Sequence, residues 1–178
     1  MGSASNSAMA APIRLAILEA DTPQPGTKKR YGGYGGVFTA LFEAACQALD
    51  PPQELGSQLY ITTHDVVNDL DSYPALDTVD AILITGSRYS AFEDEPWIVA
   101  LVEYTQRCMD AGVRVVGVCF GHQIVGRACG VPVGKNDKGW EIAVTDVELT
   151  DKGKEIFQMD KMVTFDPLSL DRDKSKIN

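Results

Sequence analysis

Histidine is scarce in this sequence, and its scarcity limits the chemistry that the chain can perform. The 178 residues include only His64 and His122, and the four cysteines form no C-x-x-C pair. A zinc site built from cysteine and histidine therefore has too few ligands, and we expect no bound metal. The same cysteine pattern indicates reduced thiols, which are typical of the cytoplasm.

Basic charge and long apolar runs are also in short supply. The chain has 16 Lys and Arg residues against 25 Asp and Glu, and this formal charge of −9 repels phosphate backbones and anionic membranes. No apolar stretch approaches the roughly 20 residues that a membrane-spanning helix needs. Residues 1–11 are small and polar, unlike a signal peptide, and we expect them to be disordered. The sequence therefore predicts a cytoplasmic protein that binds neither nucleic acid nor membrane.

Apolar runs and helical patterns alternate along the rest of the chain, and their order predicts the fold. Short apolar or alternating runs predict strands at residues 14–20, 59–63, 81–85, 113–118 and 140–149. Helical spacing predicts helices at residues 37–49, 93–109, 124–129 and 150–157, the second with acids 93–95 in its first turn. This alternation predicts an α/β fold, with a mainly parallel open sheet and helices on both faces.

Residues 22–36 contain proline and glycine and are expected to form a loop. Its second half, Tyr31-Gly32-Gly33-Tyr34-Gly35-Gly36, follows three basic residues and is suggestive of an anion-binding loop. The glycine spacing matches neither G-x-G-x-x-G nor the P-loop. A flexible loop near the mouth of a site is the favoured interpretation, and a phosphate cradle is the alternative.

The run at 113–118 leads directly into Gly117-Val118-Cys119-Phe120-Gly121, a turn of mostly small residues. Ligand sites in open parallel sheets lie at the carboxyl ends of strands. A tight strand-to-helix turn there can expose a nucleophile, as in the G-x-S-x-G elbow, and the helix N-terminus favours a thiolate. On this motif alone, a buried structural cysteine is the alternative, because free cysteines are among the most buried residues.

The longer segment Gly117–Gln123 resembles the nucleophile motif of class I glutamine amidotransferases, G-[VIL]-C-x-G-H-Q. Ile84–Ser87 is similar to that family's oxyanion loop, and Gly139–Glu141 and Leu149–Gly153 resemble the segments that follow the motif. Asp21-Thr22-Pro23 with Tyr31-Gly32 is similar to a stand-alone, GMP-synthase-like subgroup. The resemblance covers residues 12–162 and implies a flavodoxin-like sheet.

The resemblance also implies a reaction. Cys119 is expected to attack the side-chain amide of glutamine, or a γ-glutamyl bond, and to form a thioester without metal or organic cofactor. The backbone N–H groups of Gly86 and Phe120 are expected to hold the oxyanion. Gln123 is expected to shape the substrate pocket, and Arg88 to meet a substrate carboxylate, with a solvated turn as the equal alternative. An ammonia acceptor would need a separate synthetase subunit.

The resemblance is incomplete in one respect that matters for catalysis. The family's base comes from a His-x-Glu motif near the end of the domain, and neither His64 nor His122 is followed by Glu two residues later. We interpret residues 12–162 as a partial, C-terminally truncated domain and 163–178 as a poorly ordered non-family tail. We therefore expect this chain to be inactive. A catalytically dead partner-binding module and a cysteine-elbow hydrolase with another substrate are the alternatives.

Overall fold

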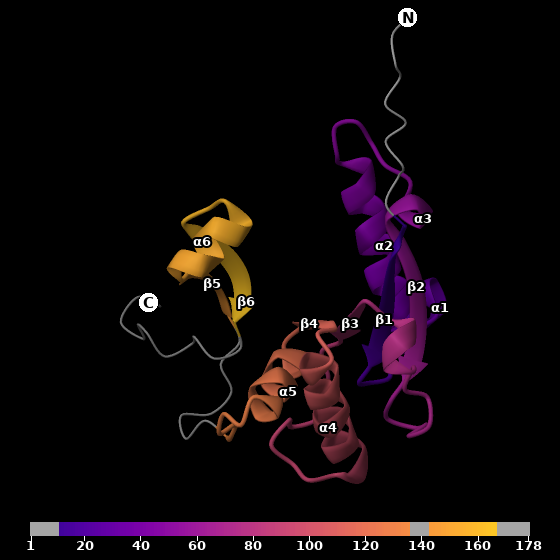
Figure 1. The fold of residues 1–178 in the computed structure, drawn as a ribbon, viewed down its shortest axis with the longest axis vertical. Coiled ribbons are helices and arrows are strands. Elements are labelled where there is room, and N and C mark those ends of the chain that lie inside the picture. Colours follow the sequence, from indigo (N-terminus) through magenta and orange to yellow (C-terminus); the bar gives the residue numbers. More distant parts are fainter. Residues whose placement is uncertain (1–10, 136–142, 167–178) are drawn as a thin grey trace, which may run out of the picture. The chain divides into compact units, whose positions relative to one another are not determined.

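The structure, a computed structural model, describes residues 11–135 and 143–166 (Figure 1). These residues belong to two compact units, of which the first extends to Val133 and the second begins at Gly134. The predicted disorder at residues 1–11 falls, except for Ala11, outside the described residues. Among the helices of the described ranges, none is long and apolar enough to cross a membrane.

The first unit alternates strands and helices, as the sequence predicts. Its elements in chain order are β1 (Ile13–Glu19), α1 (Pro25–Tyr31), α2 (Tyr34–Gln47), α3 (Leu55–Gln58), β2 (Leu59–Asp65), a 3-10 turn η1 (Leu76–Thr78), β3 (Ala81–Ile84), α4 (Pro96–Asp110), β4 (Arg114–Gly117) and α5 (Phe120–Ala128). All four expected strands of this unit are present, within one or two residues of their expected bounds.

The four strands form one parallel sheet in the order β2-β1-β3-β4. This order, in which the chain moves to one side of β1 and then to the other, is that of flavodoxin-like folds. It confirms the predicted parallel sheet and places the strands that precede Gly86 and Cys119 next to each other. Ile84 of β3 lies opposite Gly117 of β4.

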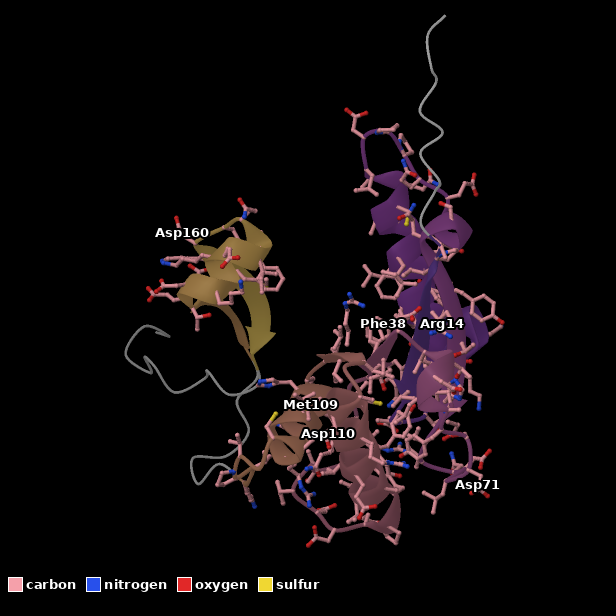
Figure 2. The ribbon with its side chains drawn as sticks, in the orientation of Figure 1. Arg14, Phe38, Asp71, Met109, Asp110 and Asp160 are labelled. Carbon is pink, nitrogen blue, oxygen red and sulfur yellow. The ribbon has the colours of Figure 1, made fainter. Side chains whose placement is uncertain are left out.

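The core lies on both faces of this sheet, and alternate residues of β1 pack on opposite faces. Leu15 and Ile17 pack with the phenylalanines of α2, among which Phe38 is labelled in Figure 2. Ala16 and Leu18 belong to a larger cluster with α4 and α5. The central strands β1 and β3 therefore contain runs of consecutive apolar residues, which are typical of parallel strands covered on both faces.

Two sequence expectations for this unit are wrong. The expected loop at 22–36 contains α1 and the start of α2, and the expected acids at 93–95 precede α4, whose first turn contains no acidic residue. The glycines of the Tyr31–Gly36 segment are explained by close packing. A Cβ atom at Gly35 would collide with Thr63, and one at Gly36 with the backbone of Tyr31.

The same segment does not provide an anion cradle. The side chain of Glu19, at the end of β1, accepts a hydrogen bond of 2.7 Å from the backbone N–H of Gly35 in the first turn of α2. A carboxylate thus already occupies the positive end of the helix dipole. Both the flexible loop and the phosphate cradle are therefore wrong for this segment.

The second unit is described from Gly134 to Lys135 and from Ala143 to Asp166. Strands β5 (Ala143–Glu148) and β6 (Lys161–Asp166) pair antiparallel, and α6 (Asp151–Phe157) connects them. The hydroxyl of Thr150 caps α6 by accepting from the backbone N–H of Gly153 at 3.1 Å, as its sequence position predicts. β6 includes residues 163–166, which we expected to lack regular structure, because its backbone pairs with β5.

At the amino ends of β1 and β3, the carboxylate of Asp80 accepts three hydrogen bonds from Arg14. Its carboxylate accepts from the backbone N–H of Arg14 at 2.8 Å, from Nε at 3.0 Å and from Nη2 at 2.8 Å. Arg14, labelled in Figure 2, also donates to the carbonyl of Asp77. The hydrogen bonds from Arg14 lower the pKa of the Asp80 carboxyl to about 2.

We expect Asp80→Asn to lower the free energy of unfolding at pH 7. Because the folded-state pKa is depressed, the contribution of Asp80 is complete above its unfolded pKa of about 4 and is lost as the pH falls toward 2. Urea unfolding at pH 7 and pH 3 should therefore show a smaller difference between variant and wild type at pH 3. Equal differences at the two pH values would contradict this assignment.

Candidate active site

Cys119 lies in the turn that joins β4 to α5, at the carboxyl end of the sheet. Its backbone has φ 52° and ψ −105°, a conformation that is strained for a residue with a side chain. The carbonyl oxygen of Cys119 accepts from the N–H of Gln123 at 3.3 Å, and the N–H of Gly121 donates to Val118 at 2.9 Å. These bonds define a tight strand-to-helix turn, and the Cys119 residue on it is exposed.

The two glycines of the G-x-C-x-G motif are required by the closeness of this turn. A Cβ atom at Gly117 would lie 2.5 Å from the carbonyl carbon and oxygen of Gly121. A Cβ atom at Gly121 would lie 2.9 Å from the Cβ atom of Ile84 and closer still to its carbonyl oxygen. The start of α5 thus rests directly on the backbone of β3, and only glycine fits at either contact.

Gly86 follows the neighbouring strand and lies beside the cysteine. A Cβ atom at Gly86 would be 3.8 Å from that of Cys119, which confirms the expectation that the two residues are adjacent. Within the described residues, neither the N–H of Gly86 nor that of Phe120 donates a hydrogen bond. Two backbone donors next to Cys119 are therefore available to a ligand.

Aromatic rings join the loop after β3 to the start of α5. Phe120 is buried and stacks on Trp97 of α4 with ring centroids 5.7 Å apart. Trp97 in turn meets the edge of Tyr89 at 5.2 Å. These rings thus pack the loop after β3 against the start of α5.

The guanidinium of Arg88 contacts Asp21 through Nε, and most of the Arg88 side chain is exposed to solvent. Its Nε lies 3.2 Å from a carboxylate oxygen of Asp21, the residue after Ala20 at the end of β1, while 64% of its side chain is exposed. Its terminal nitrogens make no hydrogen bond within the described residues. Gln123 is half-buried in the first turn of α5.

Asp21 is a residue whose place in this site the sequence analysis missed. The available signal was its position, because an acid directly after a buried strand faces the carboxyl edge of a parallel sheet. Asp21 belongs to the segment that resembles the stand-alone subgroup, but its sequence neighbours do not indicate a contact with Arg88. The structure shows it only 6% exposed at its side chain, with Arg88 as its partner.

Within the described residues, no hydrogen bond joins either histidine to Cys119. His64 lies on the edge strand β2, in the row His64, Leu18, Ile84 and Gly117, so three strand spacings of about 4.8 Å each separate it from the cysteine turn. Its Nε2 lies 2.9 Å from the hydroxyl of Thr62, and its Nδ1 bonds the carbonyl of Ser72. His122 is exposed in the first turn of α5.

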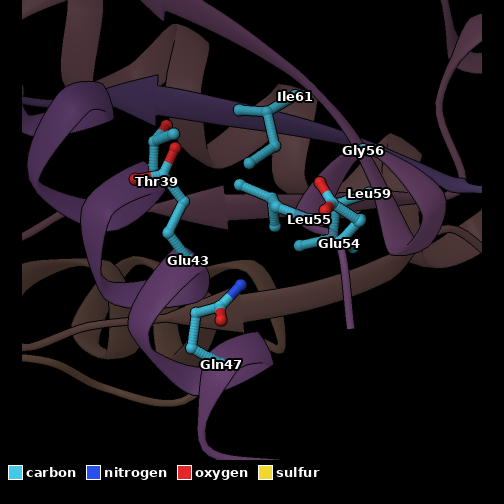
Figure 3. A pocket seen from close by; sticks show the side chains of 8 residues that line it. All are labelled: Thr39, Glu43, Gln47, Glu54, Leu55, Gly56, Leu59 and Ile61. Atoms are coloured by element: carbon cyan, nitrogen blue, oxygen red, sulfur yellow. The ribbon is translucent and has the colours of Figure 1, made fainter. Parts of the chain in front are cut away.

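A cavity of about 570 Å³ lies elsewhere in the first unit (Figure 3). Its lining comes from α2, α3 and β2: Thr39, Glu43, Gln47, Glu54, Leu55, Gly56, Leu59 and Ile61. No residue predicted for the site is among them, and β2 is the strand farthest from β4. This cavity is therefore separate from the cysteine turn.

A flavodoxin-like parallel sheet, with a cysteine at positive φ in the turn after its fourth strand, places the chain in the class of α/β proteins. Within that class, residues 52–169 match the family described as glutamine amidotransferase class-I. The chain belongs to the class I glutamine amidotransferase family.

Three similar proteins illustrate the match. A glutamine amidotransferase-like protein of Schizosaccharomyces pombe is 36% identical over 148 residues, which cover 80% of this chain and 58% of that protein. Gamma-glutamyl peptidase 3 of Arabidopsis thaliana is 33% identical over 136 residues, 76% of this chain and 50% of that one. A crystal structure of a glutamine amidotransferase from Thermotoga maritima superposes with a TM-score of 0.61 at 15% identity, over 88% of this chain and 60% of that one. The chain thus spans somewhat more than half the length of these relatives.

We expect iodoacetamide to modify Cys119 faster than any other cysteine in the folded protein. Cys46 and Cys108 are buried, and burial raises the pKa of the Cys108 thiol. Cys129 is the informative control, because it is exposed like Cys119 but lies at the C-terminal end of α5. Peptide mapping after brief treatment measures the rates, and equal labelling of Cys119 and Cys129 would contradict the expectation.

We expect Gly121→Ala to disrupt the cysteine turn, because the added methyl group collides with Ile84. Overpacking of this kind costs roughly 1–3 kcal/mol. Gly56→Ala is the matched control, since nothing lies within 4 Å of a Cβ atom at Gly56. Urea unfolding should show a loss of stability for the first variant only, and comparable stability of both would refute the close contact.

Proposed function

We propose that Cys119 is the nucleophile of a γ-glutamyl amide-cleaving site and that its turn is a nucleophile elbow. The observation that carries this proposal is the exposed position of Cys119, whose backbone has φ 52°. Beside it, the N–H groups of Gly86 and Phe120 donate no hydrogen bond within the described residues. Strained, exposed positions of this kind cluster at functional sites. A buried structural cysteine, the alternative from the motif, does not fit the exposure of Cys119.

In the proposed reaction, the Cys119 thiolate attacks the γ-carbonyl carbon, and a C–S bond forms as the carbonyl oxygen becomes an oxyanion. The N–H groups of Gly86 and Phe120 stabilise that oxyanion, and the loss of one such donor typically costs about 10²–10³ in rate. The C–N bond then breaks, and the amine takes up a proton and leaves. Water hydrolyses the γ-glutamyl thioester, which releases glutamate and restores the thiol.

The position of Cys119 at the N-terminus of α5 supports this chemistry. The nine-residue helix directs its partial positive charge and its first N–H groups toward the thiol. A thiolate and an oxyanion are both favoured at such a helix end. The elbow therefore aids the attack without a metal or an organic cofactor.

A γ-glutamyl substrate is supported by the residues around the elbow. The open side of the Arg88 guanidinium offers two terminal nitrogens to a carboxylate, which is the geometry of bidentate recognition. Gln123, half-buried in the first turn of α5, is the second residue that we assign to substrate binding. Gamma-glutamyl peptidases among the similar proteins agree with this substrate class.

We further propose that these 178 residues do not turn over substrate by themselves. His64 is about 14 Å from the cysteine turn by strand spacing and already has two partners. Without a base, an ordinary thiol is only a few per cent thiolate at neutral pH. Binding of a γ-glutamyl compound without turnover, as a module that serves a separate synthetase subunit, is the second candidate function that this arrangement favours.

We expect the chain to release no more than a stoichiometric amount of p-nitroaniline from γ-glutamyl p-nitroanilide. The adduct should map to Cys119, and Cys119→Ala should abolish it, whereas Cys129→Ala should not. Added imidazole should speed release if a missing base limits the reaction. Release of more than one equivalent of p-nitroaniline per chain without imidazole would contradict the proposed inactivity, and an adduct at another residue would contradict the proposed nucleophile.

A further inference from the structure

Two loops of the first unit meet where the strand order reverses. The loop after β1 and the loop after β3 leave neighbouring strands, and the chain continues from them to opposite sides of the sheet. In open α/β sheets, this switch point is where a crevice opens at the carboxyl edge. In this protein, side chains bridge the two loops across it.

The first bridge is made by Asp21. Its Oδ2 accepts from the backbone N–H of Arg88 at 2.8 Å, and its Oδ1 lies 3.2 Å from Nε of the same residue. Oδ1 also accepts from the backbone N–H of Thr22 at 2.7 Å. A carboxylate that is 6% exposed and bonded to two loops fixes their separation.

The second bridge is made by Thr85, which is fully buried. Its hydroxyl accepts from the backbone N–H of Ala20 at 2.9 Å and donates to the carbonyl of Gly86 at 3.0 Å. The loop after β3 is thus attached to the end of β1 on both sides of Gly86. On its other side, the loop packs through Tyr89 and Trp97 onto Phe120.

We propose that Asp21 is a positioning residue, whose bonds to Arg88 hold the Gly86 N–H in place beside Cys119. Asp21 reaches neither the cysteine nor, in this arrangement, the substrate, and it acts through the loop backbone. The proposal rests on the proposed function, because it gives Gly86 the part of an oxyanion donor. It also explains how Arg88 can pair with Asp21 and still bind the carboxylate of a substrate. Asp21 contacts Nε of Arg88, and the two terminal nitrogens remain available to the substrate.

Burial distinguishes this contact from an ordinary surface ion pair. Exposed ion pairs contribute little to stability, because both charges stay in contact with water. The Asp21 side chain is almost completely removed from water, while Arg88 remains exposed, so the carboxylate depends on its protein donors. Burial of Tyr34 and, secondly, the nearby charge of Asp21 raise the pKa of the Tyr34 hydroxyl at the start of α2.

The chain contains a matched control for this contact. Asp80 binds the backbone N–H and the guanidinium of Arg14, just as Asp21 binds those of Arg88. Both pairs join β1 to β3, but the Asp80 pair lies at the amino ends of these strands, away from Cys119. Asp21→Asn and Asp80→Asn therefore remove the same kind of interaction at opposite ends of the same two strands.

Two reactions of Cys119 separate positioning from general damage to the fold. Acylation by p-nitrophenyl acetate passes through an oxyanion, whereas alkylation by iodoacetamide does not. We expect Asp21→Asn to lower the acylation rate of Cys119 about tenfold or more, as for a misplaced oxyanion donor, and to change its alkylation rate less than about twofold. Asp80→Asn should change neither rate, and Cys129 serves as an internal reference in every sample.

Hydrogen exchange of the backbone tests the bridge independently of catalysis. Peptides that cover residues 86–88 should exchange faster in Asp21→Asn than in wild type and at the wild-type rate in Asp80→Asn. Unchanged exchange, an unchanged ratio of acylation to alkylation, or an equal fall of that ratio in Asp80→Asn would each overturn the proposal. If wild-type Cys119 is alkylated but never acylated, the proposed function fails, and the exchange comparison alone decides whether Asp21 holds the loop.

Discussion

The contact between the start of α5 and the backbone of β3 is the constraint on which the rest of the site depends. Gly121 lies so close to the carbonyl of Ile84 that no side chain fits, and Gly117 meets Gly121 in the same way. Because the helix begins this near the sheet, the chain has no room for a wider turn. Cys119 must then adopt a positive φ, which turns its side chain outward, and the N–H of Phe120 is left without an acceptor in the described residues.

The sequence predicted this region well because its signals are local. An apolar run followed by G-x-C-x-G is enough to give the strand and the turn, whereas the next helix begins at Phe120, before its expected start at Ile124. The burial of β1 and β3 was predicted from their apolar runs in the same way. The prediction for residues 22–36 failed for a physical reason: Gly33, Gly35 and Gly36 indicate freedom of the backbone, but here they make room for Glu19, Thr63 and Tyr31, which are distant in sequence or belong to the previous helix.

Contacts between loops were not predictable from local patterns. The bonds of Asp21 and Thr85 join residues 65 to 67 positions apart, and no motif of this sequence specifies them. The same holds for His64, whose removal from the site follows from strand order and not from its neighbours in sequence. Family resemblance pointed to Cys119 as the nucleophile that we propose, whereas the structure supplied the contacts of the residues around it.

The two carboxylate–arginine pairs, taken together, have a consequence for the alignment of β1 with β3. One pair joins these strands at their amino ends and the other joins the loops at their carboxyl ends, so the strands are fastened at both extremities. A slip by one residue would break both fastenings and would also exchange the apolar residues of the two faces. The register of the central strands is therefore over-determined, so the loss of one fastening alone leaves the alignment of β1 with β3 in place.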